Sequence, residues 1–472
     1  MSTFSGLNTA MSGLNAARLA METAGNNMAN VGTAGYTRQR ADFLSVGSVA
    51  STGLLASRPG VGQGVALTGI ARLADAHLDA RVRGTIALAA QSDTRAEAMT
   101  NLEGILREPG ENGLSALLND FWAGWQDVAN QPGETSPAAV LIERAKAVAN
   151  RIGLSRTEIS DQWEAQRQSL DTMVGDINAA ATAIAGLNEQ IRSTVASGGT
   201  PNALLDQRAL LTQNIAELSG ATVRELPDGT IDVLIDGNAL VTGGTVRPLE
   251  ATGATIFGGA GDPPSIQWAH RAGSPIALQS GRLAGALTVL APADDYGTGG
   301  SLAEAAKSLE GIAVKLATRV NDMQDDGYTV AGVKGPPFFK FDSSDPAGTL
   351  EVLAKGAADL ATSGTAGGNL DGSNAAKMAA IGNESDGPDA LWANLVIKIG
   401  TTTRAEAQQA VSTAVAASGA INAQQSVSAV SLDEENVALI ANQHAFQGAA
   451  RVMTAIDEML DTLINRTGLV GR

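Results

Sequence analysis

The sequence contains no cysteine, which excludes disulfides, thiolate nucleophiles and cysteine-ligated metal sites. Aromatic residues make up only 3% of the 472 residues, so small aliphatic side chains must supply most of the apolar surface. Such side chains favour close contact between helices over a wide globular core. Proline is also sparse, with 15 residues against 54 glycines, which indicates many loops but few rigid turns.

Long apolar runs are missing as well. No window approaches the roughly 18 uninterrupted apolar residues of a membrane-spanning helix, so we expect no membrane insertion. The N-terminal segment has neither a basic start nor a continuous apolar stretch, so we expect no cleaved signal peptide. The formal net charge is −17, and such an acidic surface repels nucleic-acid phosphates and anionic lipids, so neither is expected as a partner.

Groups that could carry chemistry are few. The three histidines, His77, His270 and His444, lie far apart, and no two of them have the spacing of metal ligands. No set of nucleophile, base and orienting residue is visible. The acidic run 322–327 lacks the alternating ligands and final glutamate of a calcium loop, so a helix end at Gly327 is the preferred interpretation. We therefore predict no enzyme activity, no metal and no cofactor.

What the sequence does contain is a helical pattern at both ends. Near the N-terminus, apolar residues recur at alternating steps of four and three, interrupted by Arg18 and Gly25. Near the C-terminus the same alternation is nearly unbroken. Steps of three and four over several turns indicate a coiled-coil seam. The predicted seam residues are Phe4, Leu7, Met11, Leu14, Met21 and Met28 in the first helix, and Leu432, Leu439, Asn442, Phe446, Met453, Ile456, Leu460 and Leu463 in the last.

Two interpretations of these seams remain open. Each helix can face the core of its own domain, as amphipathic helices usually do, or the two helices can pair with each other and with copies on neighbouring chains. Ser431 followed by Glu434 is typical of a capping box and predicts where the last helix begins. We expect the two ends to form one assembly element that becomes ordered on assembly.

Between the ends the pattern changes along the chain. Alternating apolar residues with Asp-Gly and Gly-Gly turns at 220–280 predict a small β-rich insertion. The segment 31–70 indicates loop with short strands. Helical periodicity covers residues 71–130, 138–195, 201–218, 301–325 and 388–425. The predicted fold is mainly α: an elongated rod with the terminal coiled-coil helices paired at one pole and the small β domain toward the other.

The length allows two to four domains, and the pattern divides the chain into four kinds of region. These are a terminal coiled-coil assembly domain at 1–40 and 428–472, a helical rod domain at 41–218, 281–330 and 386–427, a β-rich inserted domain at 219–280, and a weakly patterned outer region rich in Gly, Ser and Asp at 331–385.

The segment 26–39 reads Asn-Asn-Met-Ala-Asn-Val-Gly-Thr-Ala-Gly-Tyr-Thr-Arg-Gln. It resembles the N-terminal signature of the rod, hook and hook-associated proteins of the bacterial flagellum, and the segment 431–463 resembles the other end of that family. Further similarities to the hook-associated members spread the resemblance over most of the chain. They lie at residues 201–208, 280–287 and 337–339.

Six signature residues form a candidate turn. In it, the asparagines are expected to end the first helix, because short amides tolerate turn conformations and bond to the backbone. The glycine permits a positive φ, the tyrosine offers a buried ring with a polar tip, and the arginine can pair with a carboxylate on a neighbouring subunit. An ordinary turn would use the same residue types. The six are Asn26, Asn27, Asn30, Gly35, Tyr36 and Arg38.

The resemblance implies a structural subunit of the flagellum that polymerises on the hook tip and forms the junction between hook and filament. The implied partners are further copies of the chain in a ring or helical layer, the hook protein, the next hook-associated protein at the filament base, and an export chaperone on the C-terminal helix. The implied location is the extracellular flagellum, reached through the flagellar secretion apparatus by type III export.

Three alternatives remain. A hook or rod subunit is one, but hook proteins lack the long helical stretch at 138–218. A secreted coiled-coil adhesin is another, and it would not need the signature turn. A flagellar protein with an enzymatic insertion, such as a wall hydrolase, would need a pair of carboxylates in a cleft, and the β-rich region offers none at a plausible position.

Overall fold

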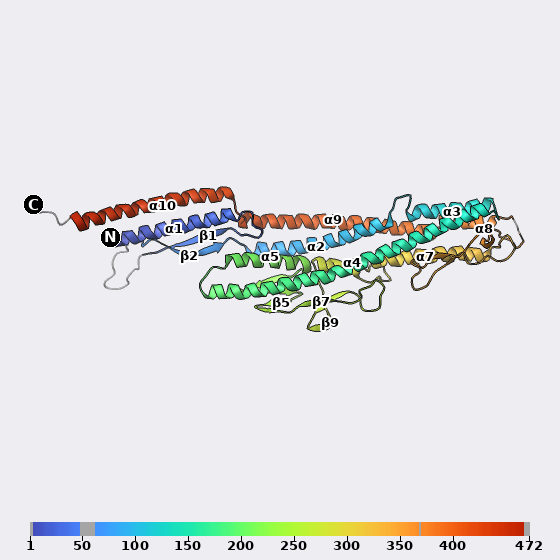
Figure 1. Ribbon diagram of the computed structural model, residues 1–472, viewed down its shortest axis with the longest axis horizontal. Helices are drawn as coiled ribbons and strands as arrows, with labels where there is room; N and C mark the ends of the chain where they lie inside the picture. The colour runs from blue at the N-terminus through green and yellow to red at the C-terminus, as the bar shows by residue number, and fades with distance from the viewer. Residues whose placement is uncertain (1–2, 48–61, 368–369, 467–472) are drawn as a thin grey trace, which may run out of the picture.

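The computed structural model describes residues 3–47, 62–367 and 370–466. The molecule is a long rod with both chain ends at the same pole (Figure 1). Helix α1 (Thr3–Ala29) and helix α10 (Leu432–Asp461) lie antiparallel there, beside the two-stranded ribbon of β1 (Gln39–Ser45) and β2 (Val65–Arg72). We call these four elements the terminal hairpin. Helices α2 to α9, with the strands between them, form the rod.

The four longest helices of the rod, α2, α4, α7 and α9, give it its length. They run side by side, and α2 packs closely against α9. No helix of the described residues is long and apolar enough to cross a membrane. The rod helices are α2 (Ala76–Leu106), α3 (Leu114–Asn130), α4 (Thr135–Ala196), α5 (Asn202–Ser219), α6 (Arg282–Leu290), α7 (Ser301–Asp326), α8 (Ser373–Ala379) and α9 (Pro388–Ser428), with short helical turns at Ala357–Asp359 and Ala380–Asn383 in the rod and at Thr462–Arg466 after α10.

Helix α4 is the longest element, with 62 residues that span about 93 Å without a break. Its buried positions recur at steps of three and four along the whole length, which keeps one face toward the rod core. Pro137 stands in its first turn, where the missing N–H disturbs no intrahelical bond. Its leucine and isoleucine residues with at most 1% exposure are Leu141, Ile152, Ile159, Leu170, Ile177, Ile184 and Ile191.

The helices predicted from the sequence are present, with ends shifted by a few residues. The stretch 71–130 is an exception, because it is divided into β2, α2 and α3. Helix α2 ends where Arg107 adopts a left-handed conformation with φ of 55°. The predicted helix end at Gly327 is confirmed, since its N–H donates to carbonyls of the last turn of α7.

At the pole away from the termini, a cluster of aromatic side chains packs the segment at 338–339 against α3. Phe121 and Trp125 of α3 contact Phe338 at ring-centroid distances of 6.0 and 5.5 Å. Phe338 and Phe339 lie 4.8 Å apart, and all four side chains are fully buried. The weakly patterned region 331–385 therefore folds onto α3 through two of its few aromatic residues, and adds one small sheet of β10 (Phe339–Lys340) and β11 (Glu351–Val352).

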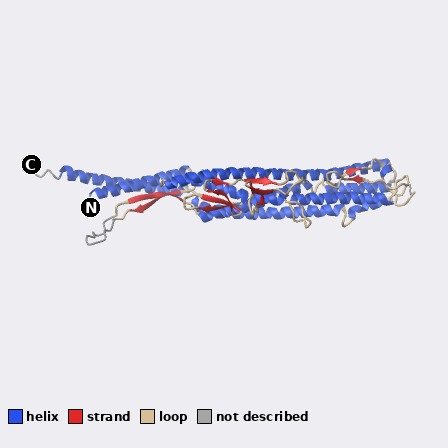
Figure 2. Cartoon of the chain, turned by 90° about the horizontal axis from the view of Figure 1, so that it is seen from below, coloured by secondary structure: helices blue, strands red, loops and turns tan. Residues whose placement is uncertain are grey.

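The β-rich insertion lies beside the middle of the rod, as both views show (Figure 1 and Figure 2). The prediction that it sits toward the pole opposite the termini is wrong. It forms two antiparallel sheets, ordered β3-β4-β5-β6 and β7-β8-β9. The strands are β3 (Thr222–Glu225), β4 (Ile231–Ile235), β5 (Asn238–Thr242), β6 (Thr245–Val246), β7 (Leu249–Thr252), β8 (Ser265–Trp268) and β9 (Arg271–Pro275).

Two asparagines of α4 fix the insertion at this place. Asn188 donates to the carbonyl of Ile231 at 2.9 Å and accepts from the N–H of the same residue at 3.2 Å. Asn178 makes the same pair of bonds with Leu249, both at 2.9 Å. Each amide pairs with one residue as a neighbouring strand would. Because α4 continues far beyond these residues, the insertion cannot form the rod tip.

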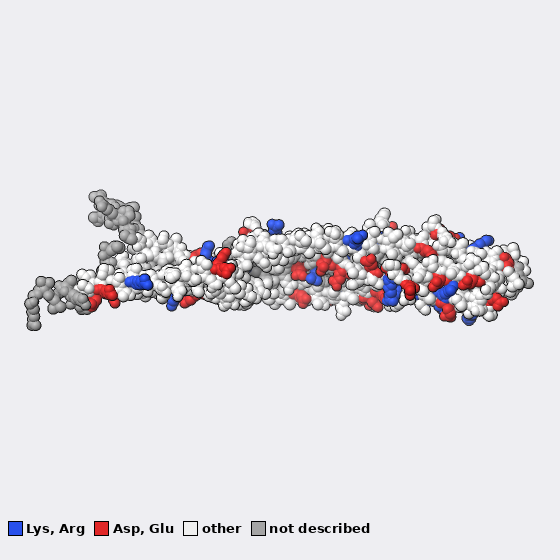
Figure 3. Space-filling view, turned by 90° about the horizontal axis from the view of Figure 1, so that it is seen from above, with Lys and Arg blue, Asp and Glu red and all other residues white. Residues whose placement is uncertain are grey.

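Charged side chains of both signs are interspersed along the face seen in Figure 3. Ion pairs also join elements of the rod, such as Arg319 with Glu384 and Lys315 with Asp386. On this face the net negative charge is thus spread along the rod and is not concentrated in one acidic patch.

Candidate functional site

The contact between α1 and α10 consists largely of small side chains on the α1 side. Ala10, Ala17 and Ala24 are buried, each one heptad after the previous one. A Cβ atom added at Gly6 would lie 3.2 Å from Ile456 Cδ1 of α10. Small residues let two helix backbones approach closely, so this pairing depends on the absence of large side chains from the contact.

On α10, the predicted seam mostly faces α1. Ile456 is buried, while Leu432 and Leu463, at the two ends, are exposed. Between them, a run of predicted residues is half-buried at steps of three and four. These are Leu439, Asn442, Phe446, Met453 and Leu460.

On α1, the predicted seam is offset by one position toward the C-terminus from the stripe of buried residues that contains Ala10, Ala17 and Ala24. Met11 is 53% exposed, and Arg18 is also exposed and pairs with Glu22 at 3.7 Å along the helix surface. The two apparent interruptions, Arg18 and Gly25, therefore lie outside the buried stripe. The other predicted residues, Leu7, Leu14, Met21 and Met28, are half-buried, and the side chain of Phe4 lies outside the described ones.

The signature turn is organised around Asn27, whose side chain is 1% exposed. Its Oδ1 accepts from the N–H of Gln39 at 3.0 Å and from the hydroxyl of Tyr36 at 2.9 Å. Its Nδ2 donates to the Gln39 carbonyl at 2.8 Å and to Glu435 Oε2 at 3.1 Å. One amide thus joins the end of α1, the start of β1 and the start of α10.

The other two asparagines close the end of α1. Asn30 Nδ2 donates to the carbonyl and to Oδ1 of Asn26, both at 2.9 Å. Asn26 Nδ2 in turn donates to the Tyr36 hydroxyl at 3.4 Å. All three predicted asparagines therefore act at the helix end, and Asn27 has the additional contact to α10.

Arg38 joins the turn to α10. Its Nε donates to Glu435 Oε1 at 2.7 Å, its Nη1 donates to Glu434 Oε2 at 2.6 Å, and its backbone N–H donates to the Ser428 carbonyl at 2.9 Å. Burial lowers the pKa of the guanidinium, but the bonds and charges of Glu434 and Glu435 outweigh it and raise the pKa overall. The carboxylate partner expected on a neighbouring subunit belongs to the same chain.

Ser431 caps the first turn of α10, as predicted, because its hydroxyl accepts from the N–H of Glu434. The side chain of Glu434 is bound by Arg38. Only the serine half of the predicted capping box is therefore observed, and the glutamate holds the signature turn.

Asp206 of α5 connects the signature turn to the rod. Its carboxylate accepts from the N–H of Thr37 at 3.3 Å and pairs with Arg72 Nε at 2.6 Å. Four residues earlier, Asn202 donates to the carbonyl of Ile70 in β2 at 2.8 Å. The family-like segment 201–208 is therefore the surface of the rod that receives the terminal hairpin.

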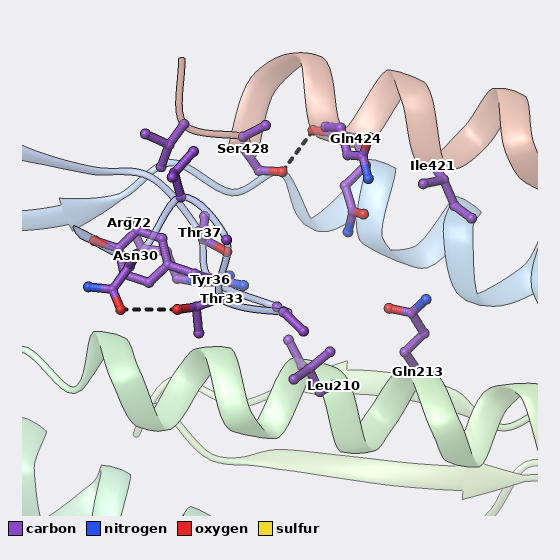
Figure 4. A pocket seen from close by; sticks show the side chains of 18 residues that line it. Asn30, Thr33, Tyr36, Thr37, Arg72, Leu210, Gln213, Ile421, Gln424 and Ser428 are labelled. Atoms are coloured by element: carbon purple, nitrogen blue, oxygen red, sulfur yellow. Dashed lines mark hydrogen bonds between the residues drawn. The ribbon is translucent and has the colours of Figure 1, made fainter. Parts of the chain in front are cut away.

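A cavity of about 410 Å³ lies between the signature turn, α5 and the end of α9 (Figure 4). Gly35 has a φ of 75°, and a Cβ atom there would lie 2.5 Å from the side chain of Leu210, so only glycine fits. The half-buried Tyr36 also lines the cavity. Burial raises the pKa of its hydroxyl, and the charges of Asp206 and Glu435 raise it further.

The polar side chains of the cavity wall are almost all amides and hydroxyls, among them Thr33 of the turn, Gln213 of α5, and Gln424 and Ser428 of α9. Such groups hold segments in place and supply no strong acid, base or nucleophile. The arrangement is thus suited to fixing the terminal hairpin on the rod. We call Thr37, Arg38, Arg72, Asp206 and Glu435 the joint.

Sequence reasoning missed four members of the joint, Thr37, Arg72, Asp206 and Glu435. In the sequence, Glu434 is identified only as half of a capping box, and 201–208 only as a similarity. Both segments carry charged side chains, and a charged side chain that becomes buried needs a partner of opposite charge or a hydrogen-bond partner. Nothing in the spacing names that partner, because the paired residues are far apart in the chain.

The chain matches three family models. The model of the flagellar hook-associated protein FlgK helical domain matches residues 99–339. Those of the flagella basal body rod protein and of the flagellar basal body rod FlgEFG protein C-terminal region match residues 7–37 and 423–466. The two terminal matches fall on the terminal hairpin and the adjoining end of α9, and the first falls on the rod.

Flagellar hook-associated protein 1 of Bacillus subtilis strain 168 is 31% identical over 514 aligned residues, which cover 100% of both chains. The chain belongs to the flagellar hook-associated protein 1 family. It is therefore a structural component of the bacterial flagellum. The member from Salmonella typhimurium is 30% identical over 71% of this chain and 59% of its own length.

A solved structure of a hook-associated protein 1 family member supports the fold. The flagellar hook junction protein FlgK from Burkholderia pseudomallei superposes with a TM-score of 0.63 at 14% identity, over 73% of this chain and 99% of that one. At this identity the likeness concerns the fold alone.

Proposed function

We propose that the protein is a structural subunit of the junction between hook and filament, and that it polymerises on the hook tip. The full-length similarity to flagellar hook-associated protein 1 carries this proposal. The match to the FlgK helical domain over 99–339 favours a junction protein over a hook or rod subunit, whose family models match only the terminal hairpin and the adjoining end of α9.

The terminal hairpin is the proposed assembly element. Its contact with the rod leaves one side of α10 uncovered, and that side carries large apolar residues. Apolar side chains arranged in this way favour burial against a further helix. The exposed residues are Val437, Ile440, Val452 and Met459 of α10, followed by Leu463 in the turn after it. We assign these residues to contacts between copies, together with the predicted seam residues that remain exposed, such as Met11 and Leu432.

The proposed partners are other copies of the chain, the hook protein below the junction and the next hook-associated protein at the filament base. An export chaperone on α10 is a further proposed partner, because the exposed apolar side of that helix needs cover before assembly. The proposed location is the extracellular flagellum, reached by type III export. We propose no enzyme activity, since the polar side chains that line the cavity at the signature turn are amides, hydroxyls and one ion-paired arginine.

Deleting the gene in its source bacterium tests the proposal. We expect hooks without filaments by electron microscopy, with flagellin released into the medium, and restoration of filaments by the intact gene on a plasmid. Normal filaments in the deletion strain would show that the protein does not form the junction.

A pair of substitutions tests the assembly element. Ile440→Asp places a charge on the exposed side of α10, and Val415→Asp places the same charge on an exposed position of α9. We expect only Val415→Asp to restore filaments when each variant is exported in equal amount. Equal restoration by both would remove α10 from the assembly contact.

A further inference from the structure

A second cavity, of about 230 Å³, lies where α2, α5 and the start of the β-rich insertion meet. Three arginines line it: Arg72 from β2, Arg83 from α2 and Arg208 from α5. Convergence of three guanidinium groups on one cavity is unusual in a chain whose net charge is −17. The volume exceeds the roughly 30 Å³ share of a single water several times.

Two of the three arginines are held in place by the protein. Arg72 Nε pairs with Asp206 Oδ1 at 2.6 Å. Arg208 Nη1 donates to Asn188 Oδ1 at 3.0 Å and to the Gly229 carbonyl at 2.8 Å. In the described part of the chain, each of these two guanidinium groups makes its polar contacts through a single nitrogen, Nε of Arg72 and Nη1 of Arg208. Each carries five N–H groups, so further donors remain for a ligand.

Arg83 has neither a hydrogen bond nor an ion pair within 4.0 Å in the described part of the chain. It is only partly exposed, and burial lowers the pKa of its guanidinium, while the more distant charges of Asp79 and Glu225 raise it. Arg83 therefore offers its guanidinium N–H groups to a ligand that enters the cavity, since no described carboxylate lies within 4.0 Å of them.

The carboxylates of the cavity do not occupy these N–H groups. Asp79 Oδ1 accepts a hydrogen bond from Gln424 Nε2 at 2.5 Å, and Glu225 makes no ion pair in the described residues. Burial, together with the positive charge of Arg72, lowers the pKa of Arg208 to about 10 although Glu225 and Asp228 raise it. The three arginines are thus matched in number by Asp79, Glu225 and the Asp206 that pairs with Arg72, but neither Asp79 nor Glu225 forms an ion pair with any of them in the described residues.

We propose that this cavity binds a small oxyanion of the phosphate class, with Arg83 as its principal partner and Arg72 and Arg208 as further donors. Guanidinium groups from three directions suit a tetrahedral anion with several acceptor oxygens. The ligand would connect α2, α5 and the loop at Gly229, so it would also fix the β-rich insertion on the rod.

The test is calorimetric titration of inorganic phosphate into the full chain at pH 7 in a chloride buffer of constant ionic strength. We expect saturable binding at one site. Arg83→Gln should weaken binding by about 10-fold or more, because a charged hydrogen bond is lost. The matched control is Arg81→Gln, an exposed position on the same helix, which should leave the affinity unchanged.

A second variant distinguishes a ligand site from a merely structural cluster. Glu225→Gln removes a negative charge that lines the cavity, so phosphate should bind at least about 2-fold more tightly. Circular dichroism checks that each variant is folded. The proposal is overturned if phosphate shows no saturable binding to the intact chain. It is also overturned if Arg83→Gln binds phosphate as tightly as the intact chain, or if Glu225→Gln binds it more weakly. Acetate titrated in parallel should bind more weakly, and equal affinity would also contradict the tetrahedral class.

Discussion

Arg38 and Glu435 lie 397 residues apart in the chain and form an ion pair of 2.7 Å between Nε and Oε1, in which the glutamate side chain is only 4% exposed. The pair connects the segment after α1 with the first turn of α10, so each end of the sequence holds the other in place. Glu435 also accepts from Asn27, and the joint therefore contains a buried carboxylate with two partners from the other end.

Replacing Arg38 with glutamine should free the terminal hairpin. The buried Glu435 would lose its charged partner, at a cost of about 2 kcal/mol in the free energy of unfolding. Hydrogen exchange followed by mass spectrometry should show faster exchange in α1 and α10 and unchanged exchange in α4. The control Arg40→Gln breaks an exposed pair with Asp42 and should change little. Equal exchange in the two variants would contradict the role of the joint.

Enlarging the small-residue contact should separate α1 from α10. Ala17→Leu inserts a large side chain at a buried position of α1, and overpacking of this kind costs about 1–3 kcal/mol. Asn15→Leu adds the same side chain at an exposed position on the same helix and should leave the pairing intact. A cysteine pair placed at 13 and 449, where the two helices are close, reports the pairing by its rate of disulfide formation. The pairing is not close-packed if both leucine variants crosslink at the same rate.

The aromatic cluster at the pole away from the termini should dominate the stability of that region. Phe338→Ala removes a fully buried ring that contacts Phe121 and Trp125, and we expect a loss of about 3–5 kcal/mol. Tyr296→Ala removes a ring that is 90% exposed and should cost almost nothing. Urea denaturation followed by tryptophan fluorescence measures both, and similar midpoints would show that the cluster is not a core.

The stability of the start of α9 should depend on pH through Asp389. Burial raises the pKa of this carboxyl above its unfolded value, although the hydrogen bond from Trp122 lowers it. A raised pKa means that the folded state binds protons more tightly, so stability rises as the pH falls through the folded pKa. Asp389→Asn should be more stable than the intact chain at pH 7, with the difference shrinking toward pH 4 in chemical denaturation.

Asp386 supplies a control of opposite sign for that measurement. A hydrogen bond from Lys315, followed by the charge of Lys315, lowers the pKa of this carboxyl. Its contribution is present above the unfolded pKa and disappears as the pH falls through the folded pKa. Asp386→Asn should therefore be slightly less stable at pH 7 and equal at low pH. The same pH trend in both variants would contradict the assignment.

Much of the fold could be predicted because the long helices carry strong patterns. The seam of α10 consists of large residues at steps of three and four, and its face toward α1 followed from them. On α1 the residues buried within the chain lie one position before the predicted seam, because alanine and glycine contribute little hydrophobicity and the larger Leu7, Met11 and Leu14 beside them dominate the pattern. Their small size is the reason that they form the contact.

The place of the β-rich insertion and the members of the joint could not be predicted for a different reason. Each depends on a polar side chain that meets a backbone or charge far away in the chain, as Asn178 and Asn188 meet their strands. Periodicity reports which face of an element is buried, but it contains no information on which distant segment covers that face. Arg38 could be predicted to need a carboxylate, and Glu435 could be identified only once the two ends were placed together.

The uninterrupted α4 determines where the molecule can yield under mechanical load. Bending the rod at mid-length would require breaking successive hydrogen bonds within one helix of 62 residues. Between the described elements the chain passes from the terminal hairpin to the rod at residues 73–75 and back at 429–431. Thr37 and Arg72 of the joint bridge the two parts through the carboxylate of Asp206 in α5. We therefore expect a torque applied to the rod to be transmitted along α4, and the elastic deformation to be concentrated at the joint, where a swivel between two differently shaped assemblies would have to lie.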